Sequence, residues 1–425
     1  MSRRSGTLTA AALAIGCVAW LASADPLRAA PDGPGALPAT VSLDTVLELL
    51  ETRSPATLAE LATVDVAAAE RITAGTLPNP VLDYSGVKLV EGSSTGAELE
   101  QQFVLNQPLL LFGQRGARRE AADRGVDAEQ ARAVAAIAER RLQARQAFVS
   151  LLARQEEAHL LERSLSELLE IERIVRGRAA AGDRSQYDVL RVETERLSLR
   201  VDALNAATEV GDASGRLAAL LGFPGWRPQA DGSLERSDVP ADGNALWESA
   251  RSKLPALAAA MRRQSAAAAA LASAERDGLP VPTLNGGAQL TQDVRGTSAV
   301  FGLTLPLPLF DRNQGAVARA RAQLDVETRH VQAETARARA DLERAAETLA
   351  GRRRALGVIE TEIEQRAPTL RRMAEDAYRE GQAGILELLD ATRSLKEIQI
   401  LRIHQLESTK LAEQDVIAAA GLDAR

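Results

Sequence analysis

The sequence predicts a mainly α fold with membrane β-strands, in which long helix hairpins, present twice, carry four strands per chain. The first observation is a junction that occurs twice, at "PLLLFGQRG" (108–116) and "PLFDRNQG" (308–315). At each, an alternating run ends in a Pro, Leu and Phe cluster and an Ala-rich helical run begins. The second is composition: apolar residues make up 45% of the chain, aromatic residues only 3%. Small side chains suit closely packed helices better than one thick core.

Self-similarity along the chain predicts two structural repeats of nearly equal length. The matched positions are Phe112 with Phe310, Gly182 with Gly381, and Gly222 with Gly421. The predicted division is a signal peptide at 1–24, a first repeat at 25–222, an interrepeat segment at 223–243, a second repeat at 244–422 and a tail at 423–425.

Both repeats are predicted to have the same order of elements: a helix, two strands, a long helix and a shorter helix. The first repeat is expected to form helix 42–75, strands 80–90 and 98–107, helix 114–180 and helix 184–221. The second is expected to form helix 244–277, strands 283–291 and 298–309, helix 312–380 and helix 384–421.

The two long helices would each span about 100 Å, far above the globular mean. Such helices are typical of coiled coils or tubes, and each needs a full-length partner to bury its apolar stripe. We therefore expect helices 184–221 and 244–277 to lie end to end beside one long helix. Helix 384–421 is expected to find its complement in 42–75.

The predicted strands alternate between apolar and polar residues, as a pleated segment with two different faces does. In 298–309, for example, Phe301 and Leu303 alternate with Val300, Gly302 and Thr304. A half-buried sheet outside a membrane also alternates, but strands of this length suit a membrane β-barrel. Four strands cannot close a barrel, and lipid offers no partner to a bare edge. The membrane interpretation therefore requires several chains, and three would supply twelve strands.

The N-terminus is typical of a secretory signal. Arg3 and Arg4 precede an apolar run, and "ASA" before Asp25 suits a cleavage site. Cys17, the single cysteine, lies inside this signal and is expected to be removed with it; lipidation of Cys17 is the alternative. The later apolar stretches are interrupted by charge every few residues, so no membrane helix is expected.

The remaining composition argues against several classes of protein. The net charge of −7 disfavours a nucleic-acid partner. The three histidines, His159, His330 and His404, have no second histidine one helical turn away, so no metal site is expected. No phosphate loop, nucleophile elbow or catalytic carboxylate pair is present, and we expect neither a cofactor nor enzymatic activity.

Six motifs, in order along the chain, resemble the outer membrane efflux proteins of the TolC type. They are "LPNP" (77–80), "PLLLFGQRGARREAA" (108–122), "AAGDRSQYDVLRVETERL" (180–197), "LAALLGF" (217–223), "PLPLFDRNQGAVARARA" (306–322) and "YREGQAGILELLDATRSL" (378–395). The second and fifth look most like the outer membrane components of heavy-metal cation exporters of the RND type.

The resemblance implies a homotrimer with a twelve-stranded β-barrel in outer membrane lipid and a long α-helical barrel in the periplasm. A periplasmic adaptor (a membrane fusion protein) and a proton-driven inner-membrane RND pump would complete the assembly. Each junction would then be the place where a membrane strand becomes a tunnel helix. The junction candidates are Pro108, Phe112, Gly113, Pro306, Pro308, Phe310 and Gly315. The prolines suit strand ends and the glycines suit turns.

Two further groups of residues follow from the resemblance. The hairpin tips far from the membrane would contact the adaptor, although ordinary helix capping also explains these residue types. The tip candidates are Gly182, Asp183, Arg184, Ser185, Gly381 and Gly384. Glu387 and Asp390 match acidic positions near the tunnel constriction, where three copies would form rings that attract cations. Solvation of one helix face is the alternative for these two acids.

The function expected is a passive export duct through the outer membrane, for heavy-metal cations and opened by adaptor contact. One alternative is a duct of the same type for drugs or secreted proteins. An alternative of a different class is a periplasmic coiled-coil scaffold or adaptor with a small sheet.

Overall fold

The computed structural model describes residues 36–92, 99–182, 185–235, 237–240, 242–291, 296–363 and 366–422. The chain divides into a unit Met1–Pro38, of which only 36–38 are described, and a unit Ala39–Arg425. The predicted signal peptide with Cys17, the tail 423–425, and Asp183 and Arg184 lie outside the described residues. The division into repeats stays a prediction.

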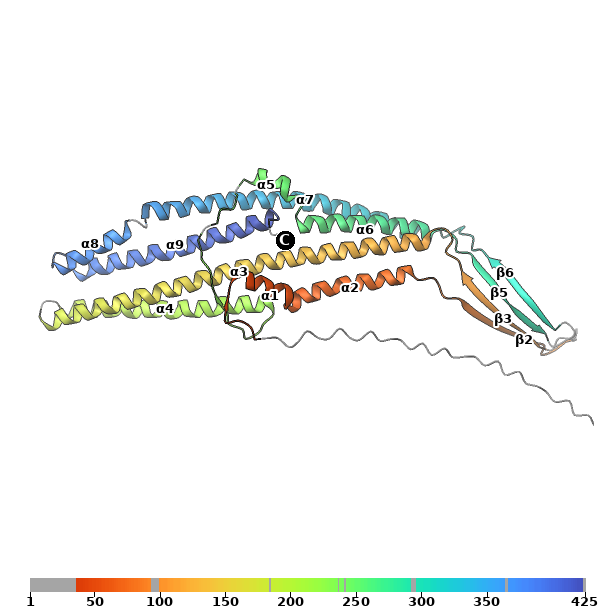
Figure 1. The fold of residues 1–425 in the computed structure, drawn as a ribbon, viewed down its shortest axis with the longest axis horizontal. Helices are drawn as coiled ribbons and strands as arrows, with labels where there is room; N and C mark the ends of the chain where they lie inside the picture. Colours follow the sequence, from red (N-terminus) through yellow and green to blue (C-terminus); the bar gives the residue numbers. More distant parts are fainter. Residues whose placement is uncertain are drawn as a thin grey trace, which may run out of the picture. The chain divides into compact units, whose positions relative to one another are not determined.

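The larger unit has the same order of elements in its two halves (Figure 1). The first half contains β1 (Thr40–Val41), α1 (Leu43–Thr52), α2 (Pro55–Gly75), β2 (Val81–Lys88), β3 (Leu99–Pro108), α3 (Gln114–Ala180) and α4 (Gln186–Leu221). After β4 (Gln229–Ala230), the second half contains α5 (Gly243–Ala250), α6 (Pro255–Asp277), β5 (Thr283–Thr291), β6 (Thr297–Thr304), α7 (Gln314–Val358), the π-helical turn η1 (Ile359–Ile363), α8 (Ala367–Arg379) and α9 (Ile385–Ala419).

Three helices predicted as continuous are interrupted, two of them directly before a proline and the third at the π-helical turn η1. Helix 42–75 divides into α1 and α2 before Pro55, and helix 244–277 into α5 and α6 before Pro255. Helix 312–380 ends as α7 at Val358, and α8 begins again with Pro368 in its first turn. Proline lacks an N–H and disfavours helix at the preceding residue, so the first two restarts are local effects. The long helix α3, whose interior has no proline, is continuous over 67 residues.

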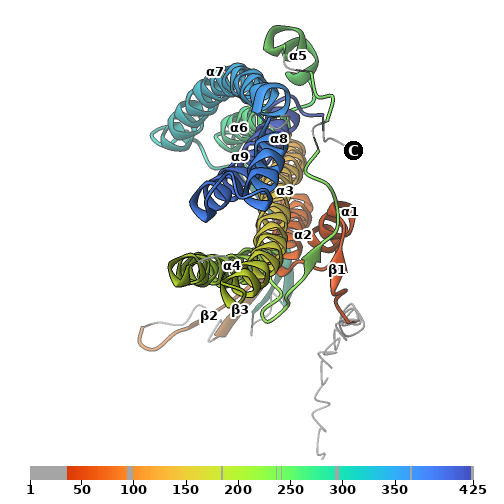
Figure 2. The ribbon, with the colours of Figure 1, turned by 90° about the vertical axis from the view of Figure 1, so that its left-hand side faces the viewer.

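The helices form one layer whose order differs from the predicted pairing. Both α2 and α4 pack against α3, while α6 and α9 pack against α7 and also against α3. The row is therefore α7, then α6 and α9 end to end, then α3, then α2 and α4 end to end (Figures 1 and 2). The expectation that 184–221 joins 244–277, and that 384–421 finds its complement in 42–75, was wrong. Each short pair instead comes from one repeat.

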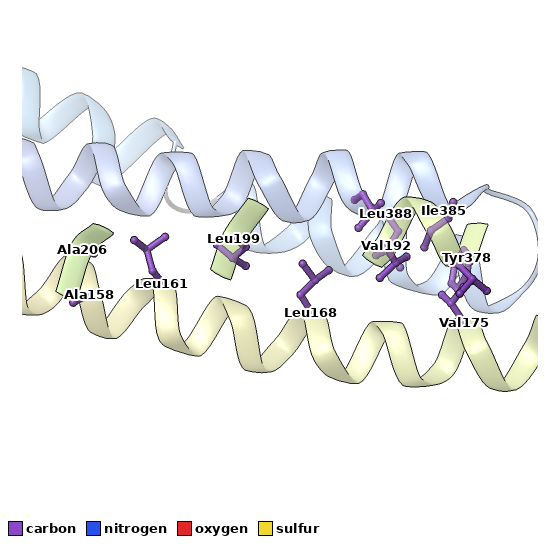
Figure 3. Close-up of a cluster of buried hydrophobic side chains, with 12 residues drawn as sticks. Ala158, Leu161, Leu168, Val175, Val192, Leu199, Ala206, Tyr378, Ile385 and Leu388 are labelled. Carbon is purple, nitrogen blue, oxygen red and sulfur yellow. The ribbon is translucent and has the colours of Figure 1, made fainter. Parts of the chain in front are cut away.

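The half of the layer away from the sheet is packed with a seven-residue spacing. On α3, Leu161, Leu168 and Val175 are buried; on α4, the buried residues Val192 and Leu199 are likewise seven apart. Together with Tyr378, Ile385, Leu388 and others they form the cluster in Figure 3. A repeat of seven keeps one apolar seam facing its neighbour along a supercoiled helix, as in coiled coils. The prediction of coiled-coil-like packing is confirmed here.

The four-stranded sheet has the order β2–β3–β5–β6, and every neighbouring pair is antiparallel. The central pair joins the two halves of the chain, since β3 comes before α3 and β5 comes after α6. Strand β6 ends at Thr304, so the predicted strand 298–309 was too long. Prolines at 306 and 308 remove two ladder donors, which explains the early end.

The interrepeat segment is hydrogen-bonded to α3, α7 and α9, among other helices. The side-chain amide of Gln155 on α3 makes two hydrogen bonds to the backbone of Ala230 in β4. Its Oε1 accepts from Ala230 N at 2.8 Å, and its Nε2 donates to Ala230 O at 3.1 Å. Further along, Glu413 of α9 is fully buried, and its Oε1 accepts from Ser237 N at 2.9 Å. Arg353 of α7 and Lys410 of α9 lie 3.4 and 3.3 Å from the same carboxylate.

Candidate functional site

One face of the four-stranded sheet is apolar and exposed in the chain. Directly opposed residues point to the same side, and the register places Tyr84 beside Phe103, and Phe103 beside Ala288. Phe301 on β6 is 89% exposed and lies on this face. The exposed large apolar residues of the face are Leu82, Tyr84, Phe103, Leu105, Leu284, Leu290, Phe301 and Leu303. So large an uncovered apolar surface marks a place where something other than water covers the sheet.

The opposite face carries a continuous row of hydrogen-bonded polar side chains. Asn106 Nδ2 donates to Asp83, and Asn285 Nδ2 donates to Asn106 Oδ1. Thr304 Oγ1 then donates to Asn285 Oδ1 at 3.2 Å, so the row crosses all four strands. Valines interrupt this face, but its centre is polar. A sheet with one apolar and one hydrogen-bonding face suits a boundary between lipid and water.

Each strand pair turns into its long helix through the same hydrogen bond. Gln114 Oε1 accepts from Phe112 N at 3.0 Å, and Gln314 Oε1 accepts from Arg312 N at 2.8 Å. The backbone before the two phenylalanines is also alike, which supports the match of Phe112 with Phe310. Leu111 N donates to Leu109 O, and Leu309 N donates to Leu307 O. The second junction therefore has two more residues between its phenylalanine and its glutamine than the first junction has, namely Asp311 and Arg312.

The prolines lie at strand ends, as predicted. Pro108 is the last residue of β3, and Pro306 and Pro308 follow the end of β6. Phe112 and Phe310 are both exposed beside them.

The backbone turn at the two junctions uses different residues. Gly113 has φ 81° and precedes α3, as expected for a glycine at this turn. At the second junction the left-handed residue is Asn313, with φ 63°, and not Gly315, which is the second residue of α7. The assignment of Gly315 to the turn was therefore wrong. Asparagine tolerates this conformation better than other side chains, and Asn313 Nδ2 donates to Ala274 O at 2.8 Å.

The hairpin tips are built alike. Gly182 after α3 and Gly381 after α8 have φ 83° and 75°, the left-handed conformation that favours glycine after a helix. Ser185 caps α4, because its side chain accepts from Asp188 N at 3.3 Å. Gly384 precedes α9 in extended backbone without a side-chain cap. Capping thus accounts for Ser185, and the adaptor contact of the tip residues stays a prediction.

A contact that was not predicted ties the two tips together. The guanidinium of Arg178, at the end of α3, lies 5.3 Å from the ring centroid of Tyr378 on α8. Arg178 also donates to Tyr378 O at 3.3 Å and to Arg379 O at 3.4 Å. An arginine over an aromatic face is held by cation–π attraction. An arginine and a tyrosine near two Gly-containing breaks were the only available signal.

Glu387 and Asp390 lie on one exposed side of α9. They are three residues apart and exposed, while Leu388 and Leu389 between them are buried. Glu387 is in the first helical turn, where a negative charge favours the helix N-terminus. A Cβ on Gly384 would lie 2.9 Å from Glu387 Oε2, so the missing side chain leaves room for this carboxylate.

One turn beyond Asp390, Arg393 of α9 is engaged by the other hairpin. Its Nε donates to Glu195 of α4 at 3.3 Å. This hydrogen bond and the charge of Glu195 raise the pKa of Arg393, with Asp390 adding a smaller effect. Arg393 is thus held by Glu195, and the carboxylate of Asp390 remains exposed.

No group of three or more His, Cys, Asp or Glu side chains in the described part of the chain is placed to hold a metal ion. Within the same residues, no helix combines the length and apolar character needed to cross a membrane.

No protein-family model matches the chain. In sequence it is similar to the cobalt-zinc-cadmium resistance protein CzcC of Cupriavidus metallidurans, with 27% identity over 337 residues, 78% of this chain and 78% of CzcC.

Solved structures similar to this fold include outer membrane channels. The outer-membrane channel OprN matches with a TM-score of 0.73 at 18% identity, over 89% of both chains. CusC matches with 0.73 at 17% identity, over 92% of this chain and 95% of CusC. The Campylobacter jejuni CmeC outer membrane channel matches with 0.73 at 17%, over 89% and 85%. The chain therefore has the fold of these channels, and its resemblance to the outer membrane efflux proteins of the TolC type is confirmed.

Proposed function

We propose that the chain is one protomer of a homotrimeric duct through the outer membrane, part of a tripartite RND-type efflux system. The observation that carries the proposal is the sheet, whose exposed apolar face lies opposite a hydrogen-bonded polar face. In this arrangement the apolar face contacts lipid and the polar face lines a water-filled barrel. Strands β2 and β6 are open edges of the sheet in one chain, and lipid cannot satisfy their backbone groups. Twelve strands from three chains would remove these edges.

The edges of the helical layer support association of several copies. At one edge α4 exposes an apolar stripe of Tyr187, Leu190, Leu197, Val201 and Leu204. At the other edge α8 exposes Leu370 and Met373. Because the two edges differ, copies would join head to tail, and such an interface forms a ring when its rotation closes. The ring of helix layers would be a periplasmic α-barrel that continues the channel, and duplicated hairpins would give each protomer two junctions and two tips.

The hairpin tips are proposed as the end that meets a periplasmic adaptor and, through it, an inner-membrane RND pump. Exposed loop tips on rigid helices are common recognition sites. Contact there would open the duct, because the Arg178–Tyr378 contact holds the two tips of one protomer together. The pump supplies the energy, and the duct itself carries out no chemistry.

Heavy-metal cations are proposed as the cargo. Similarity to CzcC, a protein named for cobalt, zinc and cadmium resistance, supports this substrate class. Glu387 and Asp390 support it independently, since three copies would place rings of negative charge near the narrow end. The same duct serving drugs or secreted proteins is the second candidate, supported by the fold alone.

Conductance in planar bilayers tests the duct and its cation preference together. The purified protein should form pores, and Glu387→Gln with Asp390→Asn should lower the cation-to-anion permeability ratio. The control is Asp325→Asn with Glu347→Gln, which removes two exposed carboxylates from α7. If the pore survives but its selectivity is unchanged, the acidic rings are wrong and the duct stands.

A protein that stays silent under all gating conditions, including removal of both acids at the tip, would contradict the duct. Fractionation without detergent separates the remaining alternative. A periplasmic scaffold would be recovered in the soluble fraction, whereas a duct would remain with outer membranes.

A further inference from the structure

Four helix ends meet at the level where the sheet begins. Arg118 of α3 pairs with Asp277 of α6 at 2.9 Å, and Gln114 Nε2 donates to Pro280 O after α6 at 3.4 Å. Asn313 holds the start of α7 to α6 through Ala274 O. The ends of α2 and α6 and the starts of α3 and α7 thus form one level, which we call the junction collar: residues 105–122, 272–282 and 305–322 with the end of α2.

Three arginines of the junction collar each contact one backbone carbonyl. Arg115 Nε donates to Gly75 O at 2.7 Å, Arg312 Nε donates to Pro308 O at 3.1 Å, and Arg276 Nη1 lies 3.5 Å from Phe112 O. All three are exposed, and none has an ion pair with a carboxylate among the described residues. Each guanidinium is therefore positioned by one backbone carbonyl, with further N–H donors left for another group.

The charge of the junction collar is opposite to that of the whole chain. Its three segments, 105–122, 272–282 and 305–322, contain seven arginines and four carboxylates, a net charge of +3 in a chain of net −7. Large apolar residues are exposed at the same level, namely Leu111, Phe112, Leu305, Leu307, Leu309 and Phe310. Phe310 is 92% exposed.

We propose that the junction collar binds the head groups of anionic phospholipids, with Arg115, Arg276 and Arg312 as the phosphate-binding residues. The inference rests on the proposed function, since it requires that the sheet lies in the membrane. The guanidinium fork matches phosphate oxygens in a bidentate arrangement. The exposed leucines and phenylalanines contact the acyl region directly above, as interfacial side chains do.

A lipid surface fits this site better than a soluble anion does. A phosphate ion would require donors that converge on one point, whereas these arginines come from three different helix ends. Arginines spread around one level, beside exposed apolar residues, match a layer of head groups at the edge of a hydrocarbon phase. The collar would thereby fix the depth at which each protomer sits in the bilayer.

The test compares lipid retention by the full-length protein reconstituted in two kinds of vesicle. One is phosphatidylcholine, and the other an equal mixture of phosphatidylcholine and phosphatidylglycerol. After extraction in mild detergent, native mass spectrometry counts the lipids kept. The variant is Arg115→Gln, Arg276→Gln and Arg312→Gln together. The matched control is Arg163→Gln, Arg263→Gln and Arg354→Gln, which removes three exposed arginines outside the collar that have no ion pair among the described residues.

The wild type and the control should keep phosphatidylglycerol over phosphatidylcholine. Each arginine near a lipid surface contributes about fivefold, so the collar variant should lose at least about tenfold of the preference. Failure of the wild type to insert into either vesicle would overturn the proposed function. Insertion into both vesicles without a preference would overturn only the collar. Equal losses in variant and control would also overturn it.

Two further measurements keep the collar testable. Inorganic phosphate that abolishes the preference at constant ionic strength would mean an anion site and not a lipid surface. If the triple variant fails to assemble, the salt dependence of the lipid preference of the wild type tests the proposal. Head-group binding by arginine must weaken as the salt concentration rises. A preference unchanged at high salt overturns the collar.

Discussion

Glu413 is a position where one substitution should strongly lower the free energy of unfolding. Its carboxylate is 0% exposed, accepts from Ser237 N and lies beside Lys410 and Arg353, whose side chains are only 17% and 26% exposed. Glu413→Ala leaves an unpaired buried N–H and two cations without their anion. Removing one partner of a buried pair costs about 3–5 kcal/mol.

The lower end of that range applies here, because both cations keep other partners. Arg353 donates to Val239 O at 2.8 Å and to Ser237 O at 2.7 Å, and Lys410 donates to Glu235 O at 2.8 Å. We therefore expect Glu413→Ala to lower the free energy of unfolding by about 3 kcal/mol. Glu413→Gln keeps an acceptor for Ser237 N and should cost about 1.5 kcal/mol.

Urea unfolding in detergent, followed by circular dichroism, measures these differences, and limited proteolysis reports on the segment 223–243. The control is Glu343→Ala on α7, which breaks an exposed pair with Arg339 at 2.9 Å and should cost about 0.5 kcal/mol or less. The segment should be cut faster in Glu413→Ala and unchanged in the control. The reasoning is refuted if Glu413→Ala costs no more than Glu343→Ala.

Two further substitutions have matched controls within the chain. Gly287→Ala should abolish assembly of the sheet, because its Cβ would lie 1.9 Å from the backbone Phe103 O, whereas Gly286→Ala meets nothing within 4 Å. The amount of folded protein recovered from each variant checks this, and equal yields would contradict it. Ser185→Ala should destabilise the start of α4 by about 1 kcal/mol, seen as faster amide exchange near the tip. Ser166→Ala, which removes a hydrogen bond to Glu162 O inside α3, should leave the tip unchanged, and equal exchange in both variants would count against the cap.

Several features of the fold were predictable because they depend on neighbours along the chain. Alternation predicted β5 at its observed bounds, and the Ala-rich run after the first junction predicted α3 at its observed bounds, 114–180. Pro55 and Pro255 were equally visible in the sequence, and they lie where two helices predicted as continuous are interrupted. Asn313 could likewise have been identified as the left-handed residue, since it precedes Gln314 as Gly113 precedes Gln114.

The sequence by itself determined which face of each element is apolar, where the strands become helices, and which residues end the helices. Only the tertiary structure decided which helices lie side by side, and hence that α9 follows α6 along α7. It also brought Arg178 to Tyr378, 200 positions away, and buried Glu413 beside Arg353. The physical reason is that the periodicity of a helix or strand defines which of its faces must be buried. Several helices with similar apolar faces could cover that face equally well. The choice among them depends on packing and charge contacts between distant residues, which no local pattern encodes.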